Sequence, residues 1–137
     1  MKKLFFYILT SLIWFNVSYA QTFVLFCSDN QLIGFDGDSG YEKQKSYKPL
    51  SFKLKIDMNK EFITSKDLGG GWEFEDFIKC KYWPAFDKYD PMLECMSAGY
   101  YIALNLKNYK FTRSRGYGFA FGKKDDIGTG YGTCEKI

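Results

Sequence analysis

Cysteine is the residue type in this sequence with the clearest chemistry. The chain has four cysteines, Cys27, Cys80, Cys95 and Cys134, and no histidine. Their spacings of 53, 15 and 39 residues lack the close pairs that zinc ligands usually form. An even count favours two disulfides if the chain leaves the reducing cytoplasm. Three pairings are open. We favour Cys80–Cys95 as a local bridge, and Cys27–Cys134 would then join the first strand to the last.

The first twenty residues carry the three parts of a secretory signal peptide. Two lysines follow Met1, residues 4–17 are almost wholly apolar, and Ser18-Tyr19-Ala20 supply small residues for a cleavage site. The apolar run is shorter than the roughly 20 residues of a membrane-spanning helix. We therefore expect cleavage after Ala20, a single domain at residues 21–137, and a bacterial periplasmic or secreted location. A retained membrane anchor is the alternative.

Charge and composition argue against a nucleic-acid partner. A leader that carries two of the 19 basic residues leaves 17 against 16 acidic ones, a net charge of about +1. Binding to a polyanion depends on neutralising many phosphates, which this charge does not support. We therefore expect no nucleic-acid partner, and no membrane span once the leader is removed.

The remaining residues give little support for catalysis or for a metal site. The commonest general base, histidine, is missing, and oxidised cysteines cannot act as thiol nucleophiles. Glu73 and Glu75 alternate with aromatic residues, as on the wet face of a strand. Asp36, Asp38 and Glu42 fit a polar turn better than a calcium loop. We expect a non-catalytic protein with no cofactor and no metal.

Residues 115–122, RGYGFAFG, need a separate interpretation. This stretch resembles the octamer of RNA-recognition-motif domains, K/R-G-F/Y-G/A-F-V-x-F/Y, over its first five positions. That resemblance implies a helix and a further strand downstream. Only 15 residues follow Gly122, and three of them are glycines, which oppose a helix. We interpret the octamer as a strand with aromatic side chains on one face and small residues on the other.

Hydrophobic residues along the chain alternate with a period of two, which is typical of strands with one buried face. The chain shows no long helical pattern, and turn residues separate the apolar segments every 8–12 residues. The predicted strands are residues 22–27, 32–36, 51–57, 62–65, 72–75, 92–96, 100–106, 111–114, 117–121 and 130–137. The glycine-rich segment 128–132 is predicted as a turn into the last of them. The fold class is therefore all-β, an antiparallel meander of about eight strands that forms a small barrel or a flattened sandwich.

Aromatic residues are the remaining functional candidates. A cleft lined by aromatic side chains is the usual form of a small-molecule site. The candidates for such a site are Trp72, Tyr82, Trp83, Tyr100 and Tyr101. The first hypothesis is a binding module for a small apolar or aromatic ligand, as the fold-level similarity to lipocalin- and avidin-type barrels suggests. The alternative is a structural or interaction component of the cell envelope. A barrel too large for its side chains favours the first, and a filled barrel with an exposed apolar patch favours the second.

Overall fold

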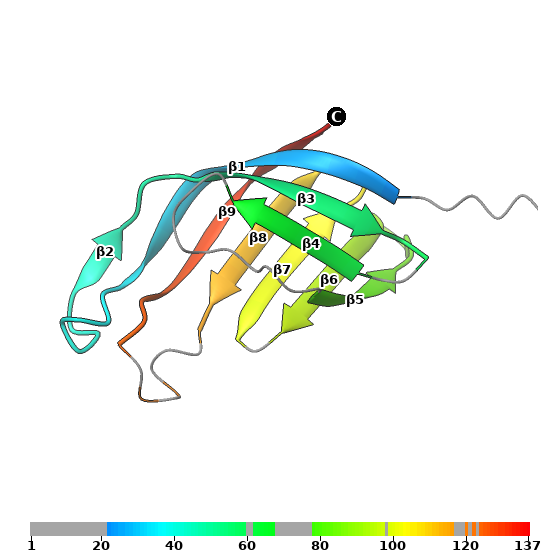
Figure 1. Cartoon of the computed structure of the whole chain (residues 1–137). Helices are drawn as coiled ribbons and strands as arrows, with labels where there is room; N and C mark the ends of the chain where they lie inside the picture. The colour runs from blue at the N-terminus through cyan, green and yellow to red at the C-terminus, as the bar shows by residue number, and fades with distance from the viewer. Residues whose placement is uncertain are drawn as a thin grey trace, which may run out of the picture.

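The chain forms an antiparallel β-sheet that closes on itself. The computed structural model describes residues 22–59, 62–67, 78–97, 99–116, 120, 122 and 124–137. Within this part of the chain the strand order is β2-β1-β3-β4-β5-β6-β7-β8-β9, and β1 also pairs with β9. Eight strands therefore make a closed barrel, and β2 is an additional strand on β1 (Figure 1). The predicted all-β meander is confirmed, in its barrel form.

Most strands are short, and the first and last are the longest. Their bounds are β1 Thr22–Phe35, β2 Gln44–Ser46, β3 Ser51–Asp57, β4 Phe62–Asp67, β5 Ile78–Trp83, β6 Met92–Ser97, β7 Tyr100–Asn105, β8 Lys110–Arg115 and β9 Ile127–Lys136. The predicted leader at residues 1–20 and the predicted strand at residues 72–75 lie outside the described residues, as does all of 117–121 except Ala120.

The first strand corrects the prediction of two strands separated by a turn. The sequence predicts a turn at residues 28–30, but β1 runs unbroken through it. A register shift between Asp29 and Gln31 marks a β-bulge against β9. Near the same place, the other edge of β1 stops pairing with β3 and, a few residues later, begins to pair with β2. The polar cluster therefore bends a continuous strand, which is a common role of bulges in closed sheets.

Side chains fill the described interior of the barrel. The buried cluster draws on all eight barrel strands, and each member is at most 6% exposed. Its members are Leu25, Cys27, Phe52, Leu54, Ile56, Ile63, Ile78, Cys80, Leu93, Cys95, Ile102, Leu104, Phe111 and Cys134. The rings of Phe52 and Phe111 meet edge to face, with centroids 5.3 Å apart. A void large enough for water would expose the side chains that line it, so this part of the interior is packed.

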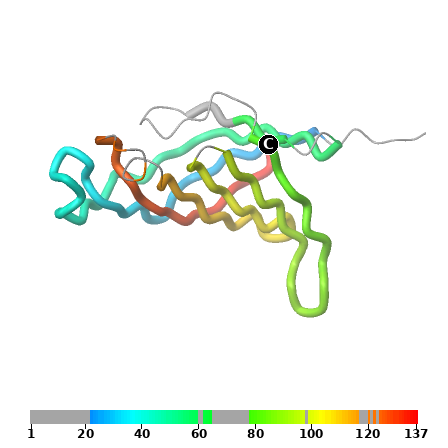
Figure 2. Tube along the Cα trace, turned by 90° about the horizontal axis from the view of Figure 1, so that it is seen from below, coloured from blue at the N-terminus to red at the C-terminus, as the bar shows by residue number. Residues whose placement is uncertain are grey.

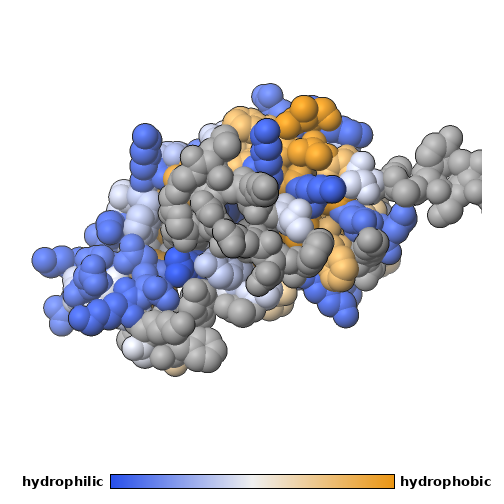
Figure 3. Space-filling model, viewed as in Figure 1, coloured by the Kyte–Doolittle hydropathy of each residue, from blue (hydrophilic) through white to orange (hydrophobic). Residues whose placement is uncertain are grey.

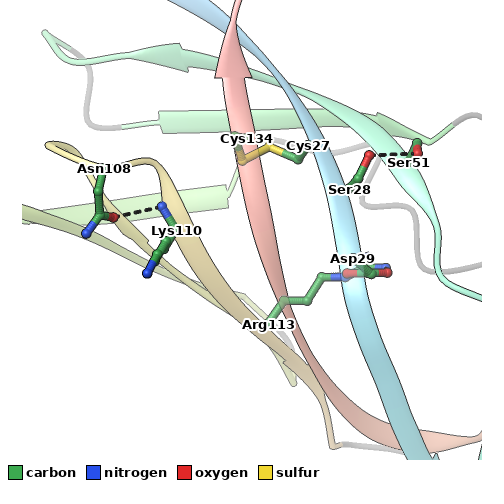
Figure 4. The surroundings of a disulfide bond; sticks show 8 residues. All are labelled: Cys27, Ser28, Asp29, Ser51, Asn108, Lys110, Arg113 and Cys134. Atoms are coloured by element: carbon green, nitrogen blue, oxygen red, sulfur yellow. Dashed lines mark hydrogen bonds and ion pairs between the residues drawn. A yellow bond between two sulfur atoms is a disulfide. The ribbon is translucent and has the colours of Figure 1, made fainter.

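Both predicted disulfides are formed. Cys27 on β1 is bonded to Cys134 on β9, across the pair of strands that closes the barrel (Figure 4). Cys80 on β5 is bonded to Cys95 on β6, its directly opposite neighbour. Disulfides persist in oxidising compartments, so the two bonds are compatible with an extracellular or periplasmic location.

The last strand begins earlier than predicted. Gly128, expected in the turn before residues 130–137, lies within β9, as do Gly130 and Gly132. A side chain at Gly132 would collide with the carbonyl oxygen of Ser28 and with the ring of Phe111. The glycines therefore allow β9 to approach β1 closely while a large ring packs beside it.

Candidate functional site

A projecting β-hairpin joins β5 to β6, and its residues Tyr82–Pro91 are called the aromatic arm below. The arm extends away from the barrel, as the tube in Figure 2 shows. Phe86 and Tyr89 form an isolated β-bridge near its tip, with reciprocal backbone hydrogen bonds of 3.2 and 2.9 Å. The tip itself is Asp87-Lys88, and Asp87 has a positive φ of 51°. Such a conformation suits aspartate better than most residues.

The arm exposes four large aromatic side chains. Phe86 is 78% exposed, Tyr89 67%, and Tyr82 and Trp83 are each 41% exposed. The sequence reasoning missed Phe86 and Tyr89 because it treated residues 83–91 as irregular. Two aromatic residues on either side of a two-residue polar turn, within a segment bounded by prolines, were the signal of a hairpin tip.

The base of the arm is anchored at three points. The Cys80–Cys95 disulfide lies two residues before Tyr82. The carboxylate of Asp90 accepts hydrogen bonds from Asn105 Nδ2 at 3.1 Å and Lys107 Nζ at 2.9 Å. These two hydrogen bonds lower the pKa of Asp90. Because these anchors fix the base, the arm is held in position although Phe86 and Tyr89 near its tip are largely exposed.

Glu94 organises the outer face at the base of the arm. The Trp83 indole Nε1–H donates a hydrogen bond of 2.9 Å to Glu94 Oε2. Lys81 Nζ lies 3.7 Å from the centroid of the Trp83 ring, within cation–π range. Burial and the nearby Glu94 carboxylate raise the pKa of Tyr101. Trp83 is therefore held between a cation and a carboxylate, with one ring face covered by Lys81.

The five predicted ligand-binding aromatics do not form one pocket in the described structure. Trp83 and Tyr101 share Glu94 on the outer face, as described above. Tyr82 pairs with Leu93 and Tyr100 pairs with Ser97, so these two tyrosines lie at opposite ends of β6. Trp72 lies outside the described residues. The ligand-binding role of these residues stays a prediction.

A shallow apolar hollow lies at the turn between β6 and β7. Its volume is about 300 Å³, and it is lined by Met96, Ser97, Gly99, Tyr100 and Tyr101. Tyr100 and Tyr101 are two of the predicted ligand-binding residues. The hollow opens on the surface, far along β6 from the aromatic arm.

The opposite end of the barrel, near β2, combines polar contacts around Asp126 with an apolar hollow of about 310 Å³ whose lining includes Ile33, Phe35 and Ile127. The Gly37 N–H donates a hydrogen bond of 2.8 Å to Asp126 Oδ1, and Lys45 Nζ lies 3.5 Å from Asp126 Oδ2. Burial raises the pKa of Asp126. The Gly37 N–H, the Tyr47 hydroxyl and Lys45 together lower this pKa by a larger amount, so the net shift is downward. The ionised carboxylate of Asp126, the residue just before β9, therefore connects the turn at residues 36–43 to the start of that strand.

Acidification is expected to loosen the polar contacts around Asp126. A carboxyl group whose pKa is lowered by folding stabilises the folded state above its unfolded pKa, and that stabilisation is lost as the pH falls through the folded pKa. NMR titration of the Gly37 amide should show a transition below the ordinary aspartate value of about 3.9. Asp126→Asn should abolish the transition. Asp38→Asn, in an exposed part of the same turn, is the matched control, and loss of the transition in that variant would contradict the assignment.

Metal sites, membrane spans and relatives give no functional lead. Within the described ranges, no three His, Cys, Asp or Glu side chains gather as a metal ion would require. No described helix has the length and apolar character to cross a membrane. Comparison with protein-family models, curated proteins and solved structures found no match. The function of this chain is therefore inferred from its own geometry.

Proposed function

We propose that this protein is an exported, non-catalytic interaction module that attaches to the bacterial cell envelope through its aromatic arm. The observation that carries the proposal is the exposure of Phe86 and Tyr89 at the arm's tip, 78% and 67%. Soluble proteins rarely leave such residues grouped on a projecting element unless another surface covers them. An aromatic side chain buries about 150–250 Å² in a contact, so the four on the arm are sufficient for a hot spot.

The packed interior supports an interaction role over a ligand carrier. A barrel that holds a small molecule needs internal space that its own side chains do not fill. The described members of the core cluster come from all eight barrel strands, and each is at most 6% exposed. The two disulfides occupy part of the same interior, since all four cysteines belong to that cluster.

Shallow surface hollows favour a small-molecule function, and one of them is lined by two predicted ligand-binding residues, Tyr100 and Tyr101. Its volume of about 300 Å³ is at the lower limit of known ligand pockets. Because the hollow is shallow, it would cover only part of a ligand. Native mass spectrometry of the unreduced, exported protein would detect a co-purified ligand and would raise this second candidate above the first.

Removing the aromatic tip should release the protein from the envelope. Each hot-spot aromatic contributes about 2 kcal/mol or more to binding, so Phe86→Ser/Tyr89→Ser should reduce the envelope-associated share at least about tenfold. The measurement is fractionation of cells that export the tagged protein. Tyr131→Ser is the matched control, because Tyr131 is a half-exposed aromatic on the barrel wall, 50% accessible. An unchanged distribution of the tip variant, with folding verified by circular dichroism, would refute the proposal.

A further inference from the structure

We infer that the surface the aromatic arm binds is an anionic lipid bilayer; this inference rests on the proposed function and names its partner. The arm has a gradient of polarity that fits a membrane interface. Phe86, the most exposed aromatic, has no polar atom and lies next to the tip. Tyr82, Trp83 and Tyr89 carry a polar group on an apolar ring. Tryptophan and tyrosine concentrate at the headgroup level of membranes for this reason.

The charges around the arm complement an anionic surface. Of the two acidic groups near the base, Asp90 is paired with Lys107, whereas Glu94 keeps its negative charge while it accepts the Trp83 indole N–H. In contrast, Lys79 and Lys81 on β5 have no ion-pair partner among the described residues. At the tip, Lys88 offsets Asp87. The four lysines of this region exceed its three acidic residues by one charge, and two of these lysines, Lys81 and Lys88, lie over aromatic rings. Lysine near anionic headgroups strengthens membrane binding.

The arm projects from the end of the barrel where β1 begins and β9 ends. The register puts the first residue of β1 opposite the last of β3, and the last of β9 beside β1 near Leu25. The arm follows the end of β5 at this same end of the strands. The arm therefore lies at the same end of the barrel as the start of β1 and the end of β9.

The surface of the barrel is partly apolar at the same end. On the face that Figure 3 displays, hydrophilic residues gather over β2, and hydrophobic residues gather toward the end where β1 begins and β9 ends. Phe23, Met58, Leu106 and Tyr109 pack there on the core and are only partly buried. Lys136 Nζ lies 5.5 Å from the centroid of the Phe23 ring. Rings and aliphatic side chains with adjacent lysines therefore lie at the same end of the barrel as the arm, and this combination is found in segments that bind at a lipid interface.

Vesicle sedimentation with the purified, disulfide-intact exported protein tests the inference. Pure phosphatidylcholine vesicles are compared with vesicles that also contain phosphatidylglycerol. We expect binding to the anionic vesicles that weakens with salt. Phe86→Ser/Tyr89→Ser should weaken it at least about tenfold, because burial of one aromatic side chain alone contributes more than a tenfold factor. Lys79→Gln/Lys81→Gln should weaken it about fivefold for each lysine, on anionic vesicles only.

Fluorescence places the arm in the bilayer independently of sedimentation. In a Trp72→Phe background of the leader-free protein, emission comes from Trp83 alone and should shift to the blue with anionic vesicles. Tyr131→Ser is again the control and should bind as the parent does. Vesicle binding that is insensitive to the tip variant would overturn the inference. Absence of vesicle binding would also overturn it. If the tip variant is nevertheless released from the envelope in cells, the proposed function stands and the partner is a protein.

Discussion

Replacing Cys27 and Cys134 together by alanine is expected to lower the free energy of unfolding by about 4–5 kcal/mol. The bond joins residues 107 positions apart, and in the chain-entropy model a loop of about 100 residues contributes about 4.7 kcal/mol by restricting the unfolded state. A domain of this size has a stability of about 5–15 kcal/mol, so the loss removes a large share. Chemical denaturation followed by tyrosine and tryptophan fluorescence measures it.

The second disulfide is the matched control for this prediction. Cys80 and Cys95 are 15 positions apart, and a loop of that length contributes about 3 kcal/mol in the same model. Cys80→Ala/Cys95→Ala should therefore be the milder variant, although it removes a bond of the same kind between directly opposite residues of paired strands. Equal losses in the two variants would contradict the entropic explanation and would point to local packing.

Much of the fold could be predicted from the sequence because alternation specifies strands wherever one face is buried. Residues 51–57 show this most clearly, since Phe52, Leu54 and Ile56 are buried and the lysines between them are exposed. Both disulfide pairings followed from spacing and from the expectation that the first and last strands are neighbours. The choice between a barrel and a flattened sandwich stayed open, because alternation within a strand contains no information on which strands pair.

The turn wrongly predicted within β1 and the misplaced start of β9 have a common physical cause. The cluster Ser28-Asp29-Asn30 and the glycines of β9 both have the composition of turns. In the structure they face each other across one strand pair, and the bulge and the glycines allow that pair to coil tightly. Local composition predicts a turn or a bulge equally well. Only the partner strand, which is far away in sequence, distinguishes the two.

The candidate site was only partly predictable for a related reason. Tyr82 and Trp83 were identified as functional candidates from residue type, but residue type does not tell whether an aromatic side chain faces a core or water. The hairpin continues beyond Lys79, which pairs with Phe62, the first residue of β4, and Phe86 and Tyr89 near its tip are exposed. The lengths of neighbouring strands decide this exposure, and they depend on register across the whole barrel.

A buried ion pair inside the barrel also escaped sequence reasoning. Arg113 on β8 donates from Nε and Nη2 to the two carboxylate oxygens of Asp29, at 3.0 and 2.6 Å (Figure 4). The side chains are 5% and 0% exposed. Asp29 Oδ2 also accepts a hydrogen bond from the Leu50 backbone N–H at 3.1 Å, and the guanidinium lies over the Phe52 ring. The pair therefore ties the bulge of β1 to β8 and to the start of β3.

Arg113→Met is expected to destabilise the protein by about 3–5 kcal/mol, because it leaves the Asp29 carboxylate buried without a compensating charge. Asp29→Asn/Arg113→Met is the informative comparison. Asparagine retains an oxygen that can accept the Leu50 N–H but carries no charge, so the double variant should recover a large part of the loss. Urea denaturation of both variants gives the two free energies.

Arg113→Lys separates the geometry of the pair from its charge. Lysine keeps a cation near Asp29 but replaces the two-pronged guanidinium with a single ammonium group, so one carboxylate oxygen loses its donor. We expect Arg113→Lys to lower the free energy of unfolding by less than Arg113→Met does. If Arg113→Met alone cost less than about 1 kcal/mol, the range for exposed pairs, the interior around Asp29 would have to admit water, and the packed barrel on which the interaction role depends would be wrong.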